Sequence, residues 1–222
     1  MAVLTEAALT PGSARARFLT GPELLAQRQD AVQRLYGLSA TSETQFRVLY
    51  LPLLRAFAEA VQMTPSDKSG GHPLLEVRLR RAERGLRRRR GVILPPGADP
   101  EQAARTEDLW TYAVLNLALL RQLARDLDAW TMTLWSADDQ PLGRWTPDSA
   151  ATRRVGVNEA LFYRLEPHPA ANGSDWTPLK VGTWLPPAAL NGLWREPEVF
   201  DVWQKALSRP ELPAWMQSLL VD

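Results

Sequence analysis

The sequence predicts a mainly α-helical fold with a small β-hairpin or a short antiparallel sheet in its C-terminal half. The strongest sign is the run from Leu115 to Leu120, which is apolar on nearly every side, as expected of a helix buried in a core. Apolar residues also recur at helical spacing in residues 43–63 and 74–90. After Trp130 the pattern changes to short alternating segments, which are typical of strands.

A lead of residues 1–18 precedes the first predicted helix. It is rich in small residues and is expected to be flexible. The helix begins at Thr20, whose hydroxyl can cap it, and Pro22 stands in its first turn. Gly37 is expected to close this helix.

The second predicted helix spans residues 43–63, and Thr41 or Ser42 can cap it. Pro52 lies within it and predicts a kink or a break into two pieces. A loop of turn-forming residues follows. A third helix is then predicted over residues 74–90.

Residues 91–100 are predicted to form a loop in which Val92, Ile93 and Leu94 pack on the core. A lead from Ala103 then joins the central helix, which is expected to continue to about Leu127.

The C-terminal part is predicted to contain short elements. Two strands joined by a turn are expected at 130–135 and 144–145, another strand at 161–165, and a loop at 167–177. Short helices are expected at 185–193, 199–207 and 213–220. We therefore interpret residues 19–222 as one domain, with a helical core (19–130) and a Trp-rich hairpin with short helices (131–222).

Composition excludes several kinds of site. The 222 residues contain no cysteine, which rules out disulfides, thiolate nucleophiles and Cys-ligated zinc. The net charge of +1 means that any electrostatic partner must be attracted by a local patch. No signal peptide and no membrane span is recognisable, so a cytoplasmic protein without membrane contact is expected. The sequence does not define the oligomeric state.

The two histidines limit metal binding further. His72 and His168 are the only ones, and each stands next to proline. A site that needs three His ligands cannot be built from one chain, and both are interpreted as polar loop residues.

The predicted helix 74–90 carries a cluster of arginines opposite its apolar stripe. A basic face of this kind can contact successive phosphates of DNA without sequence specificity. The alternative is a solvated face that Glu76 and Glu83 partly neutralise. The arginines concerned are Arg80, Arg81, Arg84, Arg87 and Arg88.

All nine tryptophans lie from Trp110 onward. Core filling is one interpretation. The other is an exposed platform on which single-stranded bases stack, or a partner surface. Trp135, Trp145, Trp176 and Trp184 are candidates for the platform, and Trp176, Trp184 and Trp194, in Pro- and Gly-rich segments, for the partner surface.

Several segments together resemble a known family. They are residues 50–63, the run Gly91-Val92-Ile93-Leu94-Pro95-Pro96-Gly97-Ala98-Asp99-Pro100-Glu101, residues 113–120, and Arg144-Trp145-Thr146-Pro147. In this order and spacing the chain resembles, from Phe18 to Leu207, the N-terminal domain of TraI-type relaxases of the MobH class, found in integrating conjugative elements. The resemblance implies a helical core like that of HD-type metal-dependent hydrolases.

The metal-binding residues of that family are not matched. The resemblance implies histidines after a Pro-x-Ser loop, at Val77 and in the hairpin at Thr146, and a His-Asp pair at Arg121 and Gln122. Guanidinium has no lone pair for a metal and would repel a cation. We therefore expect a degenerate pocket without metal or cofactor, formed by His72, Val77, Arg121, Gln122, Arg125 and Thr146.

Two uses of that pocket are open. Arg121, Gln122 and Arg125 could form a basic pocket that suits phosphate. They could instead form a structural network with acidic residues, namely Asp126, Asp128 or Glu107.

The expected function is that of a non-catalytic accessory protein, which binds DNA through the basic helix or binds a component of the conjugative transfer complex. One alternative is an active relaxase or nuclease with a relocated site, for which the candidate nucleophiles are Tyr36, Tyr50, Tyr112 and Tyr163. Another is a protein-interaction or regulatory module without DNA contact.

Overall fold

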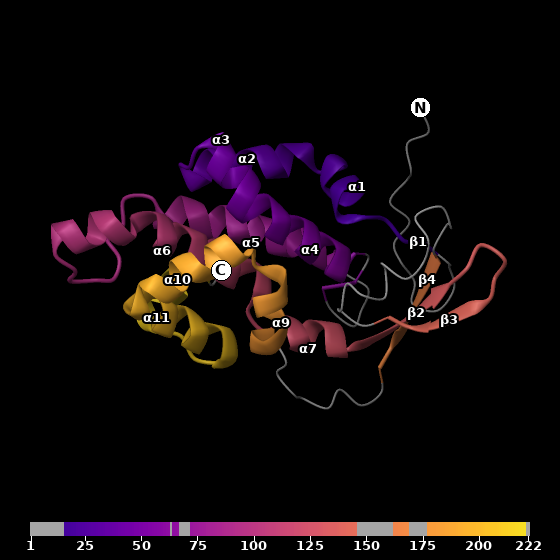
Figure 1. Ribbon diagram of the computed structural model, residues 1–222. Coiled ribbons are helices and arrows are strands. Elements are labelled where there is room, and N and C mark those ends of the chain that lie inside the picture. Colours follow the sequence, from indigo (N-terminus) through magenta and orange to yellow (C-terminus); the bar gives the residue numbers. More distant parts are fainter. Residues whose placement is uncertain (1–15, 63, 67–71, 146–161, 169–176, 221–222) are drawn as a thin grey trace.

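The computed structural model describes residues 16–62, 64–66, 72–145, 162–168 and 177–220. Thr146 and Trp176, most of the predicted lead 1–18 and most of the loop before residue 72 lie outside the described residues. The fold is mainly helical with a small antiparallel sheet, as predicted. Figure 1 shows the sheet at one end of the molecule and helices α10 and α11 at the other.

The N-terminal region contains more helical segments than the two helices predicted for it. The segments are α1 (Gly21–Ala26), α2 (Gln29–Ser39), α3 (Glu43–Gln45), the π-helical turn η1 (Phe46–Tyr50) and α4 (Leu51–Val61). The caps Thr20 and Ser42 are confirmed, each with a reciprocal capping box. The first predicted helix is interrupted at Gln27 and Arg28. Gly37 does not end it, because α2 continues to Ser39 and Ala40 takes the left-handed conformation.

Pro52 does mark an irregularity, as predicted. It has no N–H to bond the carbonyl of Val48, so the regular α-helical ladder cannot pass through it. The helix widens just before this point, and the Leu51 N–H bonds the Phe46 carbonyl, five residues back.

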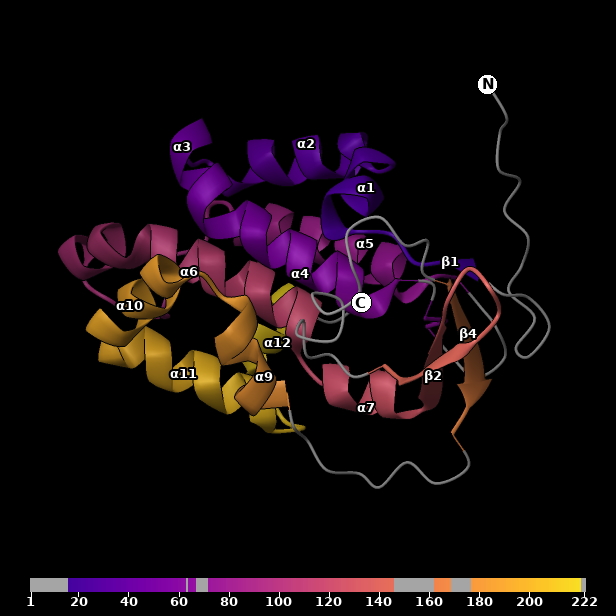
Figure 2. The same ribbon diagram turned by 45° about the vertical axis from the view of Figure 1, so that its right-hand side comes forward.

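The core lies around α6 (Pro100–Leu120), in which every residue from Trp110 to Leu120 is buried. Helix α5 (Leu74–Arg89) packs along α6, and α12 contacts both of them. Figure 2 shows α4 and α11 on opposite sides of α6. The loop between α5 and α6 contributes only Leu94 to the core. Val92 and Ile93, predicted to pack there, are exposed.

The central helix is shorter than predicted. It ends at Leu120, and Arg121 and Gln122 separate it from α7 (Leu123–Asp128). Arg121 has a non-helical ψ of 128°, and Gln122 is left-handed with a φ of 60°.

The sheet has the strand order β1-β4-β2-β3, all antiparallel. The strands are β1 (Ala16–Arg17), β2 (Trp130–Trp135), β3 (Pro141–Arg144) and β4 (Phe162–Pro167). Strand β1 lies in the lead that was predicted to be flexible. It was not predicted because a strand of two residues leaves no alternating pattern to detect.

The C-terminal helices are α9 (Thr177–Trp184), α10 (Pro187–Arg195), α11 (Pro197–Ser208) and α12 (Ala214–Leu220). Helix α9 was not predicted, and the other three match the predicted short helices closely. None of the helices in the described part of the chain is long and apolar enough to cross a membrane.

Candidate functional site

The junction of α5, α6 and α7 is held by one buried arginine. The side chain of Arg78 is 5% exposed and forms an ion pair with Asp126. It also donates to the carbonyl oxygens of Arg121, at 3.0 Å, and Ala118, at 3.5 Å. The end of α6 leaves backbone carbonyls without helical partners, and a cation there also meets the negative end of the helix dipole. Arg78 therefore closes the end of the core helix.

This junction is where the resemblance places metal-binding residues. Val77 is half-buried. Its neighbour Arg78 donates to the Arg121 carbonyl, so the two segments lie next to each other. The Arg121 side chain donates to the backbone carbonyls of Pro210 and, at 3.3 Å, Arg209. Burial and the positive charge of Arg78 lower the pKa of Arg121.

The other residues of the expected pocket do not join this network. Gln122 is half-buried, Arg125 is exposed, and His72 is exposed in the turn before α5. Within the described ranges, no three His, Cys, Asp or Glu side chains gather in a way that could hold a metal ion.

Arg78 was missed in the sequence, although a signal for it exists. It stands three residues after Leu75 and four before Ala82, so helical spacing puts it on the apolar stripe. Arg89 repeats this pattern three residues after Leu86, and it too is buried, with bonds to the carbonyls of Val92 and Glu107.

The arginine face of α5 is largely engaged by its own neighbours. Arg80 pairs with Glu76 at 3.3 Å, and Arg87 pairs with Glu83 at 2.6 Å. Arg88 donates to the Ser218 carbonyl at 3.2 Å. Of the remaining two, Arg81 is half-buried and Arg84 is exposed. The face keeps exposed positive side chains, but acidic partners reduce its net charge.

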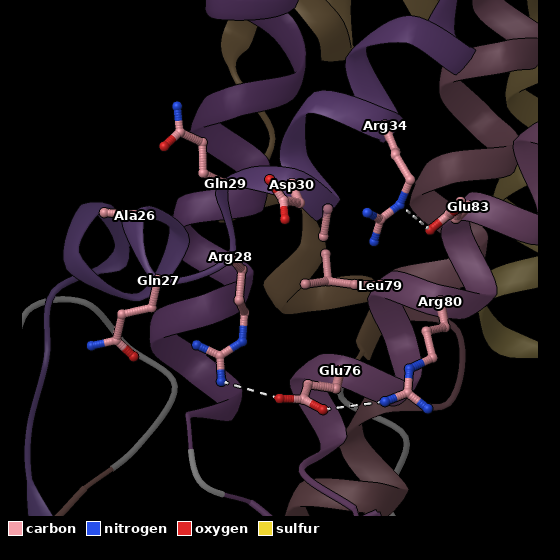
Figure 3. A pocket seen from close by; sticks show the side chains of 11 residues that line it. Ala26, Gln27, Arg28, Gln29, Asp30, Arg34, Glu76, Leu79, Arg80 and Glu83 are labelled. Atoms are coloured by element: carbon pink, nitrogen blue, oxygen red, sulfur yellow. Dashed lines mark hydrogen bonds and ion pairs between the residues drawn. The ribbon is translucent and has the colours of Figure 1, made fainter. Parts of the chain in front are cut away.

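A pocket of about 390 Å³ lies between α5 and the junction of α1 and α2. Figure 3 shows Arg28 and Arg80 reaching Glu76 from two sides, at 3.6 and 3.3 Å, and Arg34 reaching Glu83 at 3.0 Å. The lining holds Arg28, Arg34, Arg80, Asp30, Glu76 and Glu83 as its charged residues. Positive and negative groups are equal in number, so net charge does not favour an anion there.

The described tryptophans divide into core and surface residues. Trp184 is 7% exposed and packs in the core, so the prediction that it forms a partner surface is corrected. Trp145, a platform candidate, is also buried. Trp194 is 69% exposed, and its ring makes an edge contact with Phe200 at 4.9 Å between centroids. Trp135 is half-buried on β2.

The tyrosines are poorly placed to act as nucleophiles. Tyr50, Tyr112 and Tyr163 are buried, and burial raises the pKa of each. The hydroxyl of Tyr112 is already used, donating to the Leu49 carbonyl at 3.1 Å. Tyr36 is half-buried, and its ring contacts Phe46.

Comparison with known proteins agrees with the resemblance described above. Residues 15–200 match the sequence model of the TraI_2 family, which is described as "putative helicase". No protein of established annotation matches the chain. Because the family match covers well over half of the 222 residues, the chain carries a TraI-type domain and belongs to the TraI_2 family.

Proposed function

We propose that this protein is a non-catalytic accessory relative of the conjugative relaxases and binds DNA without cleaving it. The observation that carries the proposal is the network of Arg78, Arg121 and Asp126 at the end of α6. Membership of the TraI_2 family supports a relation to conjugation. A degenerate HD-like core and a cytoplasmic location remain predictions.

The chemistry of the network opposes a divalent metal. The guanidinium of Arg78 is a permanent cation without a lone pair, and it already takes the backbone carbonyls and the carboxylate that could serve as ligands. A second guanidinium, that of Arg121, lies close enough for the charge of Arg78 to help lower its pKa. A metal ion would have to displace one cation and approach another.

The position of the tyrosines also supports a role without cleavage. A tyrosine nucleophile must reach a phosphodiester and lose its proton, and burial opposes both for Tyr50, Tyr112 and Tyr163. The sequence holds no G-x-x-x-x-G-K-[S/T] phosphate-binding loop, so helicase action driven by ATP is not part of the proposal.

The proposal is tested by metal content, cleavage and binding measured on the same purified protein. We expect no stoichiometric iron, manganese or zinc by elemental analysis, and no nicking of a single-stranded oligonucleotide with added Mg²⁺ or Mn²⁺. We expect binding to DNA that weakens between about 50 and 200 mM salt. Bound metal at stoichiometry, or nicking that is lost in Tyr36→Phe, would overturn the non-catalytic role.

A second candidate is a protein-interaction module, which the exposure of Trp194 favours. Tryptophan is enriched among the few residues that contribute most of the binding energy of protein interfaces. Absence of DNA binding at low salt would favour this candidate, together with cross-linking to a protein of the transfer complex that Trp194→Ala abolishes. Cross-linking that is unchanged in Trp194→Ala would mean that Trp194 is not part of the interface.

A further inference from the structure

We propose that the outer face of the four-stranded sheet is a stacking surface for a single-stranded polynucleotide. This inference rests on the nucleic-acid binding proposed above and assigns it to a surface distinct from the arginine face of α5. The surface combines two aromatic residues of the central strands with arginines on both edge strands and between them. They are Trp135, Phe162, Arg17, Arg144 and Arg164.

Strand register places these five residues on one face. Arg17 pairs with Phe162, and Phe162 pairs with Trp135, which makes a row across β1, β4 and β2. Residues directly opposite one another in antiparallel strands point to the same side. The alternate residues Leu134 and Tyr163, also paired, are buried, so the row lies on the side away from the core.

A second row runs beside the first. Arg164 pairs with Thr133, and Thr133 pairs with Arg144, across β4, β2 and β3. The two rows are two residues apart along the strands, and side chains alternate with this period. The second row therefore lies on the same outer face, about 7 Å from the first.

The two rows are joined by a contact between their side chains. The guanidinium of Arg164 lies over the ring of Trp135, with its central carbon 4.2 Å from the ring centroid. Unpaired bases stack on aromatic rings and on guanidinium planes alike. The contact thus places a cation and an aromatic ring together on the outer face, where a base can stack.

Charge at the edges of the sheet favours a polyanion. Arg17 and Arg144 are exposed, and neither side chain makes a hydrogen bond or ion pair within the described ranges. Arg164 forms an ion pair with Asp139 at 3.7 Å, and Glu166 of β4 lies on the same face. Arg17 lies near enough to Glu23 to help lower the pKa of that carboxyl, but it forms no ion pair with it. Two exposed cations therefore flank the aromatic row, in contrast to Arg80 and Arg87 of α5, which form ion pairs with glutamates.

The dimensions suit a single strand. Arg17 and Trp135 are separated by two strand spacings, or about 10 Å, which a few nucleotides can span. A duplex hides the faces of its bases, so a surface that works by stacking discriminates against it. DNA and RNA share the phosphates and base faces used here, and the experiment must distinguish them.

The test compares the affinities of variants of the full chain for a labelled oligonucleotide of about 12 nucleotides, by fluorescence anisotropy. Trp135→Ala is expected to weaken binding about five- to a hundredfold, and Trp135→Phe to restore most of it, because the stacking face is kept. In Arg17→Ala/Arg144→Ala, the slope of log K against log salt should fall in magnitude by about 1.4, since two phosphate contacts are lost.

The matched control is Arg47→Ala/Arg195→Ala, which removes the same charge from exposed residues on η1 and α10, away from the sheet. The control should bind like the wild type. Equal losses in the control and sheet variants, or a loss confined to Arg84→Ala/Arg87→Ala/Arg88→Ala, would overturn the sheet surface and leave DNA binding intact. A wild-type protein that binds neither single strands nor duplex would overturn both proposals.

Parallel titrations with the DNA and RNA forms of the oligonucleotide, and with the DNA duplex, complete the test. Tighter binding of either single strand than of the duplex supports stacking, and the preferred form identifies the natural ligand class. Tighter binding of the duplex would contradict the proposal. Circular dichroism melts of each variant confirm that losses of affinity are measured on folded protein.

Discussion

Arg78 is a buried charge whose partners are all supplied by one junction. Its guanidinium donates hydrogen bonds to two carbonyls at the end of α6 and forms an ion pair with the carboxylate of Asp126 on α7. Removing one member of a buried pair leaves the other uncompensated. This residue therefore ties three helices together at the point where the backbone leaves helical geometry.

We expect Arg78→Ala to lower the free energy of unfolding by about 2–4 kcal/mol. The lower part of this range is appropriate because the Asp126 side chain is 26% exposed and water can reach it. Urea unfolding of Arg78→Ala, Asp126→Ala and the double variant measures the coupling. Arg125→Ala is the control on the same segment and should be nearly neutral, since Arg125 is exposed. Additive losses would contradict the pairing.

The capping box of α1 predicts a dependence of stability on pH. Bonds from the backbone N–H and hydroxyl of Thr20 lower the pKa of Glu23 from its ordinary value of 4.5. A carboxylate whose pKa is lower in the folded than in the unfolded protein stabilises the fold at pH values above its ordinary pKa. This stabilisation is lost as the pH falls through the lowered pKa of the folded state. The difference in melting temperature between wild type and Glu23→Gln should therefore be largest near neutral pH and shrink in acid. A difference that does not change with pH would exclude this role.

At the scale of elements, α1 and α4 approach so closely that only glycine fits between them. A Cβ on Gly21 would stand 2.5 Å from the backbone oxygen of Arg55, which cannot move as a side chain can. Gly37, on α2, has nothing within 4 Å of the same position. The two glycines therefore serve as test and control.

We expect Gly21→Ala to destabilise the protein by about 1–3 kcal/mol through forced separation of α1 from α4. Gly37→Ala should stabilise it by about 0.5–1 kcal/mol, because alanine favours a helix interior. Thermal unfolding of both variants measures the contrast. Equal effects of the two substitutions would mean that α1 can shift to admit the methyl group.

The π-helical turn before α4 is matched by packing as well as by Pro52. Its rings Phe46 and Tyr50 stack at 5.2 Å, and Tyr50 meets Tyr112 of α6 edge-on at 5.0 Å. The Tyr112 hydroxyl donates a hydrogen bond to the carbonyl of Leu49 in the turn. The core helix thus supports the irregular backbone that proline requires.

At the scale of the whole molecule, the low net charge limits how DNA can be bound. With a charge of +1, only local clusters attract phosphates. Figures 1 and 2 place the sheet and α10, which carries Trp194, at opposite ends. A strand on the sheet therefore leaves the Trp194 surface open to another partner.

The salt dependence of the wild-type protein follows from this arrangement. Three arginines on the sheet, each neutralising one phosphate of a single strand, predict a slope of about −2 for log K against log salt. The measurement is a titration series of the same oligonucleotide at several salt concentrations. A slope near −5 would mean that the arginine face of α5 also takes part.

The sequence by itself determined the main helices, the caps at Thr20 and Ser42, the first strand of the hairpin and the mainly helical class. The second strand was predicted too late in the chain, at 144–145, whereas β3 spans Pro141–Arg144. The correctly predicted features depend on spacing and on contacts within a few residues, which a single chain displays directly. The family resemblance likewise followed from short segments in order.

Only the tertiary structure decided which charged residues are structural and which stay available. Helical spacing puts Arg78 on the apolar stripe of α5, but its partners, Asp126 and the carbonyl of Ala118, reach it only because the end of α6 meets that face of α5. Strand β1 and the outer face of the sheet depend on pairing between segments over a hundred residues apart. The pairing of Arg17 with Phe162 leaves no local pattern, because its free energy comes from contacts that exist only after folding.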